Sequence, residues 1–239
     1  MDIFAKVTVL AYFFWNDDGA PEAFGKIAYA LEQTWRWCGH LRSVLVVNKR
    51  HECVERFGAE HDDVTVQVEP TLQPGSLYSM SVDCISRLHS RFETDYVLIV
   101  QDDGYPLRAG LEEFVGMWDF VGAPHVRNRW YLRLASRLLG FHPMNGGFSL
   151  RSKRCCEAVE RLWTEKYHVL GDCPDTCEDW FYTGYLPKHE PSYKRQMRFP
   201  DVRTALRFSY EYLGQKYSIR GIPLGFHREK ALEQRGYAK

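Results

Sequence analysis

Short apolar runs alternate with longer amphipathic stretches through the first half of this 239-residue chain, and this alternation limits its possible folds more than any other feature. A short apolar run bounded by polar residues suits a buried strand, whereas apolar residues spaced three and four apart suit a helix. The apolar runs predict strands at 6–14, 41–47, 64–68 and 96–100. The amphipathic stretches between them predict helices at 22–38, 51–57 and 76–92.

This strand–helix order predicts an α/β fold with a mostly parallel, doubly wound, Rossmann-like sheet and helices on both faces. The second half is less regular, with a short strand at 120–123 and helices at 152–166 and 178–186. No repeat or linker divides the chain, so we expect a single domain over 1–239. Residues 1–104 would form a nucleotide-binding half, and residues 105–239 a substrate-binding half.

Composition narrows the classes of protein to consider. Lys and Arg together number 31, as do Asp and Glu, so a globally basic nucleic-acid binder is disfavoured. No apolar run is long enough to cross a bilayer. Seven scattered cysteines favour a reducing compartment over a disulfide framework, and the N-terminus reads as a buried strand rather than a signal peptide. Cys173 and Cys177 lack a second pair to complete a zinc site. We therefore expect a cytoplasmic protein.

In such sheets the ligand crevice lies beyond the carboxyl ends of the strands. The most informative strand end is the run Tyr96-Val-Leu-Ile-Val-Gln-Asp-Asp-Gly104, where Asp102 and Asp103 follow a buried strand. One interpretation is a turn, for which Asp-Gly is a common pair. The other is a site for Mg²⁺ or Mn²⁺, which prefer oxygen ligands and share them with a substrate diphosphate.

An ordered set of segments resembles GT-A-type glycosyltransferases, and in particular a family of small, largely bacterial GT-A-like proteins of unassigned function. The resemblance spans roughly 5–230 and rests on Val100-Gln-Asp-Asp-Gly104, Trp118-Asp-Phe-Val-Gly-Ala-Pro124, Asn145-Gly-Gly-Phe-Ser-Leu-Arg-Ser152, Glu178-Asp-Trp-Phe181 and Gly225-Phe-His227. It implies a GT-A-like single domain whose donor is a nucleotide-sugar and whose cofactor is a divalent metal, Mn²⁺ or Mg²⁺.

The resemblance also assigns roles around the cation. The Asp-x-Asp motif of GT-A enzymes corresponds here to Gln101-Asp102-Asp103, with Gln in the first position. We expect Asp103 to bind the metal, with His227 as the second protein ligand. Gln101 and Asp102 would bind the donor, and Lys230 would pair with its phosphate. For His227, the alternative is an ordinary packed histidine.

Further donor and substrate contacts are predicted from the same pattern. Tyr12 and Asn48 follow or end buried strands and would contact the donor. Asn145, Gly146 and Gly147 would lie beside the donor sugar and acceptor, because glycine permits close backbone approach. The alternative for these glycines is a tight turn.

The acids of Glu178-Asp179-Trp180 lie at the start of a predicted helix, where they would stabilise the helix dipole in any protein. The resemblance to inverting enzymes implies that Asp179 is the general base and that Glu178 binds acceptor hydroxyls. Trp180 would stack on a sugar, although core packing is its alternative. Asp119 is either an acceptor contact or a structural residue.

Residues 127–139 carry Arg without acids beside an apolar stripe. Such a helix would rest on an anionic membrane at the inner face, with a glycolipid acceptor, or be a solvated helix packed on the sheet.

These observations and the resemblance together predict a metal-dependent glycosyltransferase that inverts the anomeric centre. It would move a sugar from a nucleotide-sugar donor to a hydroxyl of a glycan or glycolipid, without nucleic acid as a partner. The enzymatic alternative is a nucleotidyltransferase or sugar-nucleotide pyrophosphorylase. It is disfavoured because no Gly-rich basic loop follows the first strand. A non-catalytic carbohydrate- or nucleotide-binding module is the third possibility, which Gln101 keeps open.

Overall fold

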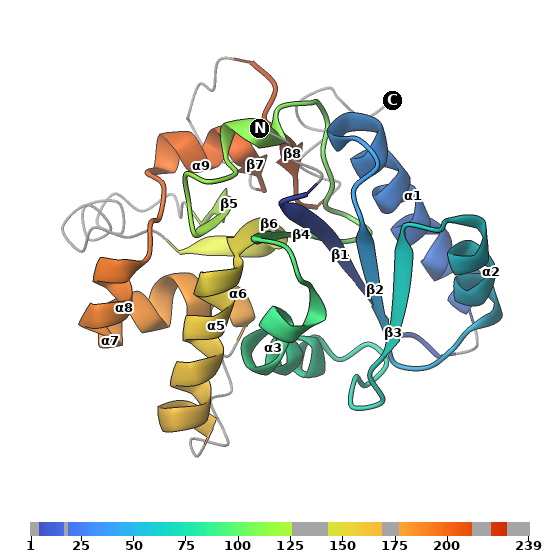
Figure 1. Cartoon of the computed structure of the whole chain (residues 1–239), viewed down its shortest axis with the longest axis horizontal. Helices are drawn as coiled ribbons and strands as arrows, with labels where there is room; N and C mark the ends of the chain where they lie inside the picture. Colours follow the sequence, from blue (N-terminus) through green and yellow to red (C-terminus); the bar gives the residue numbers. More distant parts are fainter. Residues whose placement is uncertain (1–4, 17–18, 126–142, 169–176, 212–220, 229–239) are drawn as a thin grey trace.

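A computed structural model describes residues 5–16, 19–125, 143–168, 177–211 and 221–228. Its centre is a six-stranded sheet in the order β3-β2-β1-β4-β6-β5 (Figure 1). The strands are β1 (Val7–Phe13), β2 (Ser43–Val47), β3 (Val64–Val68), β4 (Tyr96–Val100), β5 (Phe120–Pro124) and β6 (Met144–Ser152). The strands predicted at 64–68 and 96–100 agree residue for residue.

The sheet is mostly parallel, as predicted. β1 pairs in parallel with both β2 and β4, and β2 pairs in parallel with β3. β6 runs antiparallel between β4 and β5. The sequence did not predict a strand that includes Gly146 and Gly147, because glycines are poor strand formers and suggested a turn. Both glycines instead lie inside a strand that is buried along its whole length.

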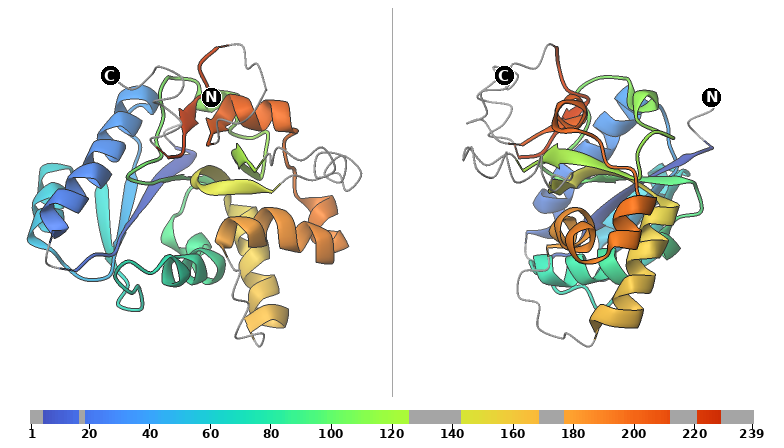
Figure 2. Two further views of the ribbon diagram at one scale, coloured as in Figure 1. Left: turned by 180° about the vertical axis from the view of Figure 1, so that it is seen from behind. Right: turned by 90° about the vertical axis from the view of Figure 1, so that its left-hand side faces the viewer.

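Helices cover both faces of the sheet (Figure 2). The first half supplies α1 (Ala20–Cys38), α2 (Glu52–Glu60) and α3 (Leu77–Ser86), followed by a 3-10 turn at Leu88–Arg91. The second half supplies α5 (Lys153–Leu162), α6 (Glu178–Trp180), α7 (Leu186–His189), α8 (Pro191–Gln196) and α9 (Val202–Phe208). A π-helical turn at Phe181–Tyr185 joins α6 to α7. None of the helices in the described ranges has the length and apolarity needed to cross a membrane.

Two apolar cores result from the alternation of side chains along each strand. On β1, Val7 and Val9 face the core formed with α1, α2 and α9, whereas Leu10 faces the core formed with α3 and α5. A strand buried on both faces needs apolar residues at every position, which explains the continuous apolar runs in the sequence. This burial fixes the position of the carboxyl ends of the strands.

The end of the described chain returns to the carboxyl end of β4. β7 (Ser209–Tyr210) and β8 (Gly225–Phe226) form a small parallel sheet, and Gly225 also bridges to Pro106 just after β4. The His227 amide donates to the Tyr210 carbonyl at 3.0 Å, and the Arg228 amide donates to the Asp103 carbonyl at 2.7 Å. These bonds hold residues 227–228 against the acidic turn.

Candidate functional site

A tight turn places the two adjacent aspartates at the carboxyl end of β4. The amides of Gln101 and Gly104 each donate to the other's carbonyl at 3.0 Å, so Asp102 and Asp103 occupy the two corners. Their side chains diverge: the Asp103 carboxylate faces His227, and the Asp102 carboxylate faces helix α1. The turn interpretation and the site interpretation of this motif are therefore compatible.

Gln101, Asp103 and His227 converge on one point. His227 Nε2 lies 3.1 Å from Gln101 Oε1 and 3.4 Å from Asp103 Oδ1. His227 is buried, while the Asp103 side chain is 38% exposed, so the group opens to solvent on the side of Asp103. The predicted metal ligands therefore lie together, although they are far apart in the sequence.

Gly147 on β6 makes room for this convergence. A Cβ atom built there would overlap His227 Nε2 and come too close to Gln101 Oε1. The Gly147 amide donates to Asn145 Oδ1 at 2.7 Å, which fixes the Asn145 side chain. The glycine is thus required by the close approach of the His227 side chain to the backbone of β6, and not by a turn; its expected contact with a sugar stays a prediction.

The residues suit a divalent cation. Asp103 supplies a carboxylate oxygen, Gln101 an amide oxygen and His227 an imidazole nitrogen, a donor set that suits Mn²⁺ or Mg²⁺. Among the described residues, no group of three or more His, Cys, Asp and Glu side chains could hold a metal ion. The third oxygen or nitrogen donor at this point is therefore the Gln101 amide, which is not an acidic side chain.

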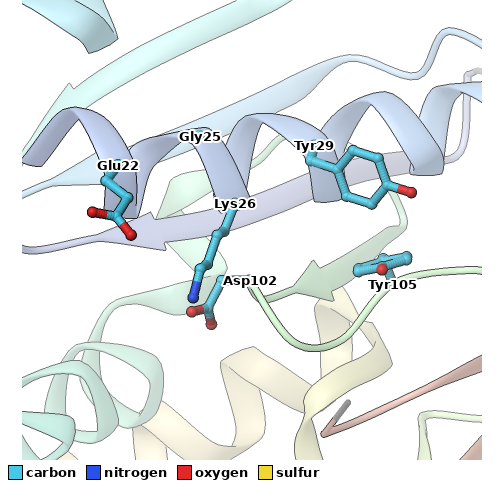
Figure 3. A pocket seen from close by; sticks show the side chains of 6 residues that line it. All are labelled: Glu22, Gly25, Lys26, Tyr29, Asp102 and Tyr105. Carbon is cyan, nitrogen blue, oxygen red and sulfur yellow. The ribbon is translucent and has the colours of Figure 1, made fainter. Parts of the chain in front are cut away.

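Asp102 lines a pocket of about 290 Å³ on the other side of the turn. The Lys26 ammonium group from α1 points toward the Asp102 carboxylate (Figure 3). The rings of Tyr29 and Tyr105 meet edge to face at 5.6 Å along the wall. Burial and the charge of Asp103 raise the pKa of Asp102, and Lys26 works in the opposite direction.

Asp179 lies across β6 from the convergence point. Its Oδ2 accepts a hydrogen bond from the Gly146 amide at 3.3 Å, and its Oδ1 accepts one from the Trp180 amide at 2.6 Å. His125 Nε2 lies 3.6 Å from Asp179 Oδ2. Burial works to raise the pKa of Asp179, but the His125 imidazole, the Trp180 amide and the Arg151 charge outweigh it, so the pKa is lowered.

Glu178 is buried, and each of its two carboxylate oxygens has a polar partner. Its Oε1 lies 3.1 Å from the Arg151 guanidinium, and its Oε2 accepts a hydrogen bond from Ser81 at 3.2 Å. Arg151 is itself fully buried, stacks between the rings of Phe120 and Tyr182, and donates to the Gly146 carbonyl at 3.3 Å. This placement suits a residue that positions Asp179 and β6 better than one that binds acceptor hydroxyls.

The structure adds two residues that sequence reasoning missed, Glu211 and His125. The Glu211 side chain is fully buried and lies within ion-pair distance of His125, His227 and Arg228. Arg228 adopts a left-handed backbone with φ 74°, uncommon outside glycine. The only signal for Glu211 was its place directly after β7, a strand of two residues, which is too short to be recognised from sequence.

Two predicted donor contacts lie in other environments. The Tyr12 hydroxyl is buried and donates to Asp83 Oδ2 at 2.8 Å, with Cys84 beside it. Burial raises the pKa of Tyr12 well above its ordinary value. Asn48 donates to the Trp15 carbonyl at 3.2 Å, which orders the loop after β1. No contact among the described residues joins either one to the Asp103 group.

Asp119 lies near the amino end of β4, at the other end of this strand from Asp103. Tyr96, the first residue of β4, pairs with Ser152, whose hydroxyl donates to Asp119 Oδ1 at 2.9 Å. Asp119 is fully buried and also binds Arg154 and Arg198; burial opposes these bonds, yet they hold its pKa well below the usual range. Of the two roles considered for it, the structural one agrees with this position. Trp180, by contrast, is 43% exposed beside Asp179.

Several predictions lie outside the described residues. They are the phosphate contact of Lys230, the basic helix over 127–139 with its membrane contact, and Cys173.

Residues 79–227 match the family model described as "Protein of unknown function (DUF5672)". The chain belongs to the DUF5672 family. Curated proteins offer no match to this DUF5672 chain.

Solved structures share the fold of the DUF5672 chain at low sequence identity. Mouse xyloside xylosyltransferase 1 in its apo form has a TM-score of 0.56 and 12% identity, covering 94% of this chain and 98% of that one. The galactosyltransferase LgtC, with donor and acceptor sugar analogs, has a TM-score of 0.51 and 11% identity, covering 96% and 93%. The glycosyltransferase GlyE of Streptococcus pneumoniae TIGR4 has a TM-score of 0.52 and 13% identity, covering 93% and 54%. These similarities confirm the predicted GT-A-type fold.

Proposed function

We propose that this DUF5672 protein is a divalent-metal-dependent glycosyltransferase that moves a sugar from a nucleotide-sugar donor to an acceptor hydroxyl with inversion. One observation carries the proposal: Gln101, Asp103 and His227 meet within 3.1–3.4 Å at the carboxyl end of β4, with Asp179 across the same strand β6. A carboxylate for proton transfer and a separate donor set for a cation are the two elements that the reaction needs.

Asp103 and His227 would hold Mn²⁺ or Mg²⁺, with the Gln101 amide oxygen as a third donor. A bound cation supplies positive charge to offset the charge that grows on the departing nucleoside diphosphate. Asp102 would orient the donor from the other corner of the turn, where its pocket with Lys26, Tyr29 and Tyr105 has room for part of the nucleotide. The exposed side of Asp103 is the side from which the diphosphate would enter.

Asp179 would act as the general base. Its carboxylate accepts the proton of the acceptor hydroxyl while that oxygen forms a bond to the anomeric carbon. The bond from the anomeric carbon to the diphosphate oxygen breaks, and its electron pair leaves with the diphosphate. An aspartate carboxylate is ionised at neutral pH at its ordinary pKa, as a base requires, and the lowered pKa of Asp179 leaves it ionised while making it a weaker base.

The neighbourhood of Asp179 suits a sugar acceptor. Trp180 is half-exposed beside it, and an indole face can stack on a sugar ring. The part of β6 that lies between Asp179 and His227 consists of Asn145, Gly146 and Gly147. A donor sugar would lie against this part of the strand. The acceptor class proposed is a hydroxyl-bearing glycan or glycolipid.

A thermal-shift screen of nucleotide-sugars with and without Mn²⁺ tests the proposal. We expect one donor to raise the melting temperature only with the metal; a ligand at 100 times its Kd stabilises by about 2.7 kcal/mol. Release of nucleoside diphosphate from that donor should follow. Turnover of a sugar phosphate with a nucleoside triphosphate would instead identify a nucleotidyltransferase. Binding without any turnover across a broad acceptor panel would identify a binding module.

A further inference from the structure

We propose that Glu211 is a positioning residue that couples the two halves of the site, by binding the Nδ1 atoms of both His125 and His227. The proposal rests on the proposed function only for its consequence in transfer; the geometry of the two imidazoles can be tested without metal, donor or activity.

Two histidines lie within ion-pair distance of Glu211, one at each of its carboxylate oxygens. His227 Nδ1 lies 3.6 Å from Glu211 Oε1, and His125 Nδ1 lies 3.7 Å from Glu211 Oε2. Each histidine turns its other nitrogen toward a carboxylate of the site. His227 Nε2 faces Asp103, and His125 Nε2 faces Asp179. Glu211 is therefore the centre of a five-member row of side chains that runs from the candidate metal ligand to the candidate base.

Burial makes this arrangement consequential. The Glu211 side chain has no exposed surface, so a negative charge on it can be stabilised only by neighbouring polar and charged groups and not by water. Among the described residues, Glu211 Oε2 and His227 Nδ1 are buried atoms without a hydrogen-bond partner. An imidazole N–H donates and a carboxylate oxygen accepts, so Glu211 is a suitable partner for His227 Nδ1. The contacts of 3.6–3.7 Å are within ion-pair distance and slightly longer than hydrogen bonds.

Other contacts fix the carboxylate between the histidines. The Asn145 amide donates to Glu211 Oε1 at 3.4 Å, and Arg228 Nε lies 3.3 Å from the same oxygen. Asn145 and Arg228 come from segments that also hold the site, since Arg228 donates its amide to the Asp103 carbonyl. Glu211 thereby joins β6, the segment at 225–228 and His125 at the end of β5.

The chemical consequence is a fixed orientation for both imidazoles. A histidine that donates Nδ1–H to a carboxylate presents Nε2 on the opposite side, which is how second-shell carboxylates orient metal-binding histidines. Glu211 would hold His227 Nε2 toward Asp103 and Gln101, and His125 Nε2 toward Asp179. Loss of this carboxylate would affect both the cation site and the base, whereas loss of either histidine would affect one.

The first experiment uses metal-free wild-type protein labelled with ¹⁵N in histidine, with His125→Gln and His227→Gln for assignment. We expect Nδ1 of both imidazoles to carry a proton. An unprotonated Nδ1 on either ring would overturn the proposal, and this measurement needs no variant of Glu211.

The second experiment compares Glu211→Gln with Glu190→Gln. Glu190 is a similarly buried carboxylate that binds Lys166 and Tyr167 instead. We expect Glu211→Gln to move the ¹⁵N signals of both rings and to weaken Mn²⁺ binding, followed by electron paramagnetic resonance, by about 10–100-fold. Glu190→Gln should do neither. Unchanged ring signals in folded Glu211→Gln would refute the role of Glu211.

The two experiments separate this inference from the proposed function. If wild-type protein binds no Mn²⁺ but both Nδ1 atoms are protonated and respond to Glu211→Gln, the metal-dependent function fails and the positioning role stands. If Mn²⁺ binds and the donor is turned over, but the ¹⁵N signals of both rings are unchanged in Glu211→Gln, the function stands and the positioning role fails.

Discussion

Gly147 lies directly against the imidazole of His227, so closely that a methyl group in place of its hydrogen would overlap Nε2. The strand β6 and the segment at 225–228 can therefore approach each other only with glycine at this position. The same methyl group would press on Gln101 Oε1. The absence of a side chain at position 147 is therefore what allows His227 and Gln101, two of the predicted donors for a cation, to lie together.

Gly147→Ala should displace His227 and weaken Mn²⁺ binding by about tenfold or more, in the range seen when metal-orienting contacts are lost. Electron paramagnetic resonance of free Mn²⁺ measures the affinity. Gly58→Ala is the matched control, because its added methyl meets only the Val66 side chain at 3.3 Å. Wild-type affinity in Gly147→Ala would show that His227 is not a ligand.

Asp103→Ala should abolish the Mn²⁺-dependent stabilisation by a nucleotide-sugar, because the carboxylate nearest His227 is removed. The shift in melting temperature, with and without metal, measures the loss. Asp95→Ala removes an exposed aspartate from the other end of β4, which pairs only loosely with Lys6 at 4.0 Å, and should keep the shift. An undiminished shift in Asp103→Ala would contradict the metal assignment.

Asp179→Asn should lower the rate of transfer by about 10²–10⁴-fold, the usual contribution of a general base. Donor binding should persist, since Asp103 and His227 are unchanged. Rapid-quench measurement of sugar transfer, beside a thermal shift with donor and Mn²⁺, separates the two effects. Normal transfer by this variant would remove Asp179 from the role of base.

Arg151→Met should destabilise the fold by about 3–5 kcal/mol, because it leaves Glu178 buried without its partner. Adding Glu178→Gln should recover part of that loss, since no unpaired charge then remains. Urea unfolding of the single and double variants measures both effects. Equal destabilisation by the two proteins would show that the charge pair is unimportant and that packing between Phe120 and Tyr182 dominates.

Stability should fall as pH drops from about 4.5 toward about 2, in part because of Glu69. Burial works to raise the pKa of Glu69, but Thr71, Arg91 and Arg87 outweigh it and lower the pKa from 4.5 to about 2. The folded state then binds fewer protons than the unfolded state, so its advantage is present above 4.5 and lost in acid. Glu69→Gln should flatten this part of the pH profile of unfolding free energy. A profile identical in shape to the wild type would exclude the contribution.

The sequence by itself determined the main frame of the fold. Strands buried on both faces must be apolar at every position, so β4 and its acidic end were visible in the sequence, and the strand–helix order implied a parallel sheet. The same logic located Asp102 and Asp103 at the carboxyl edge. For Gly147 it left open a tight turn and a close approach of a sugar to the backbone, and it did not indicate that His227 lies against this glycine.

Only the tertiary structure decided which distant residues meet. The extent of β6 was not predicted, because Gly146 and Gly147 have low strand propensity; they occupy the strand because Glu178 and His227 leave no room for a Cβ atom there. Asp119 and Glu178 look like site acids in the sequence, yet their burial beside arginines is a property of packing. Glu211 carries no local signal, because its place between His125 and His227 depends on long-range contacts among β5, β7 and β8 that no periodicity records.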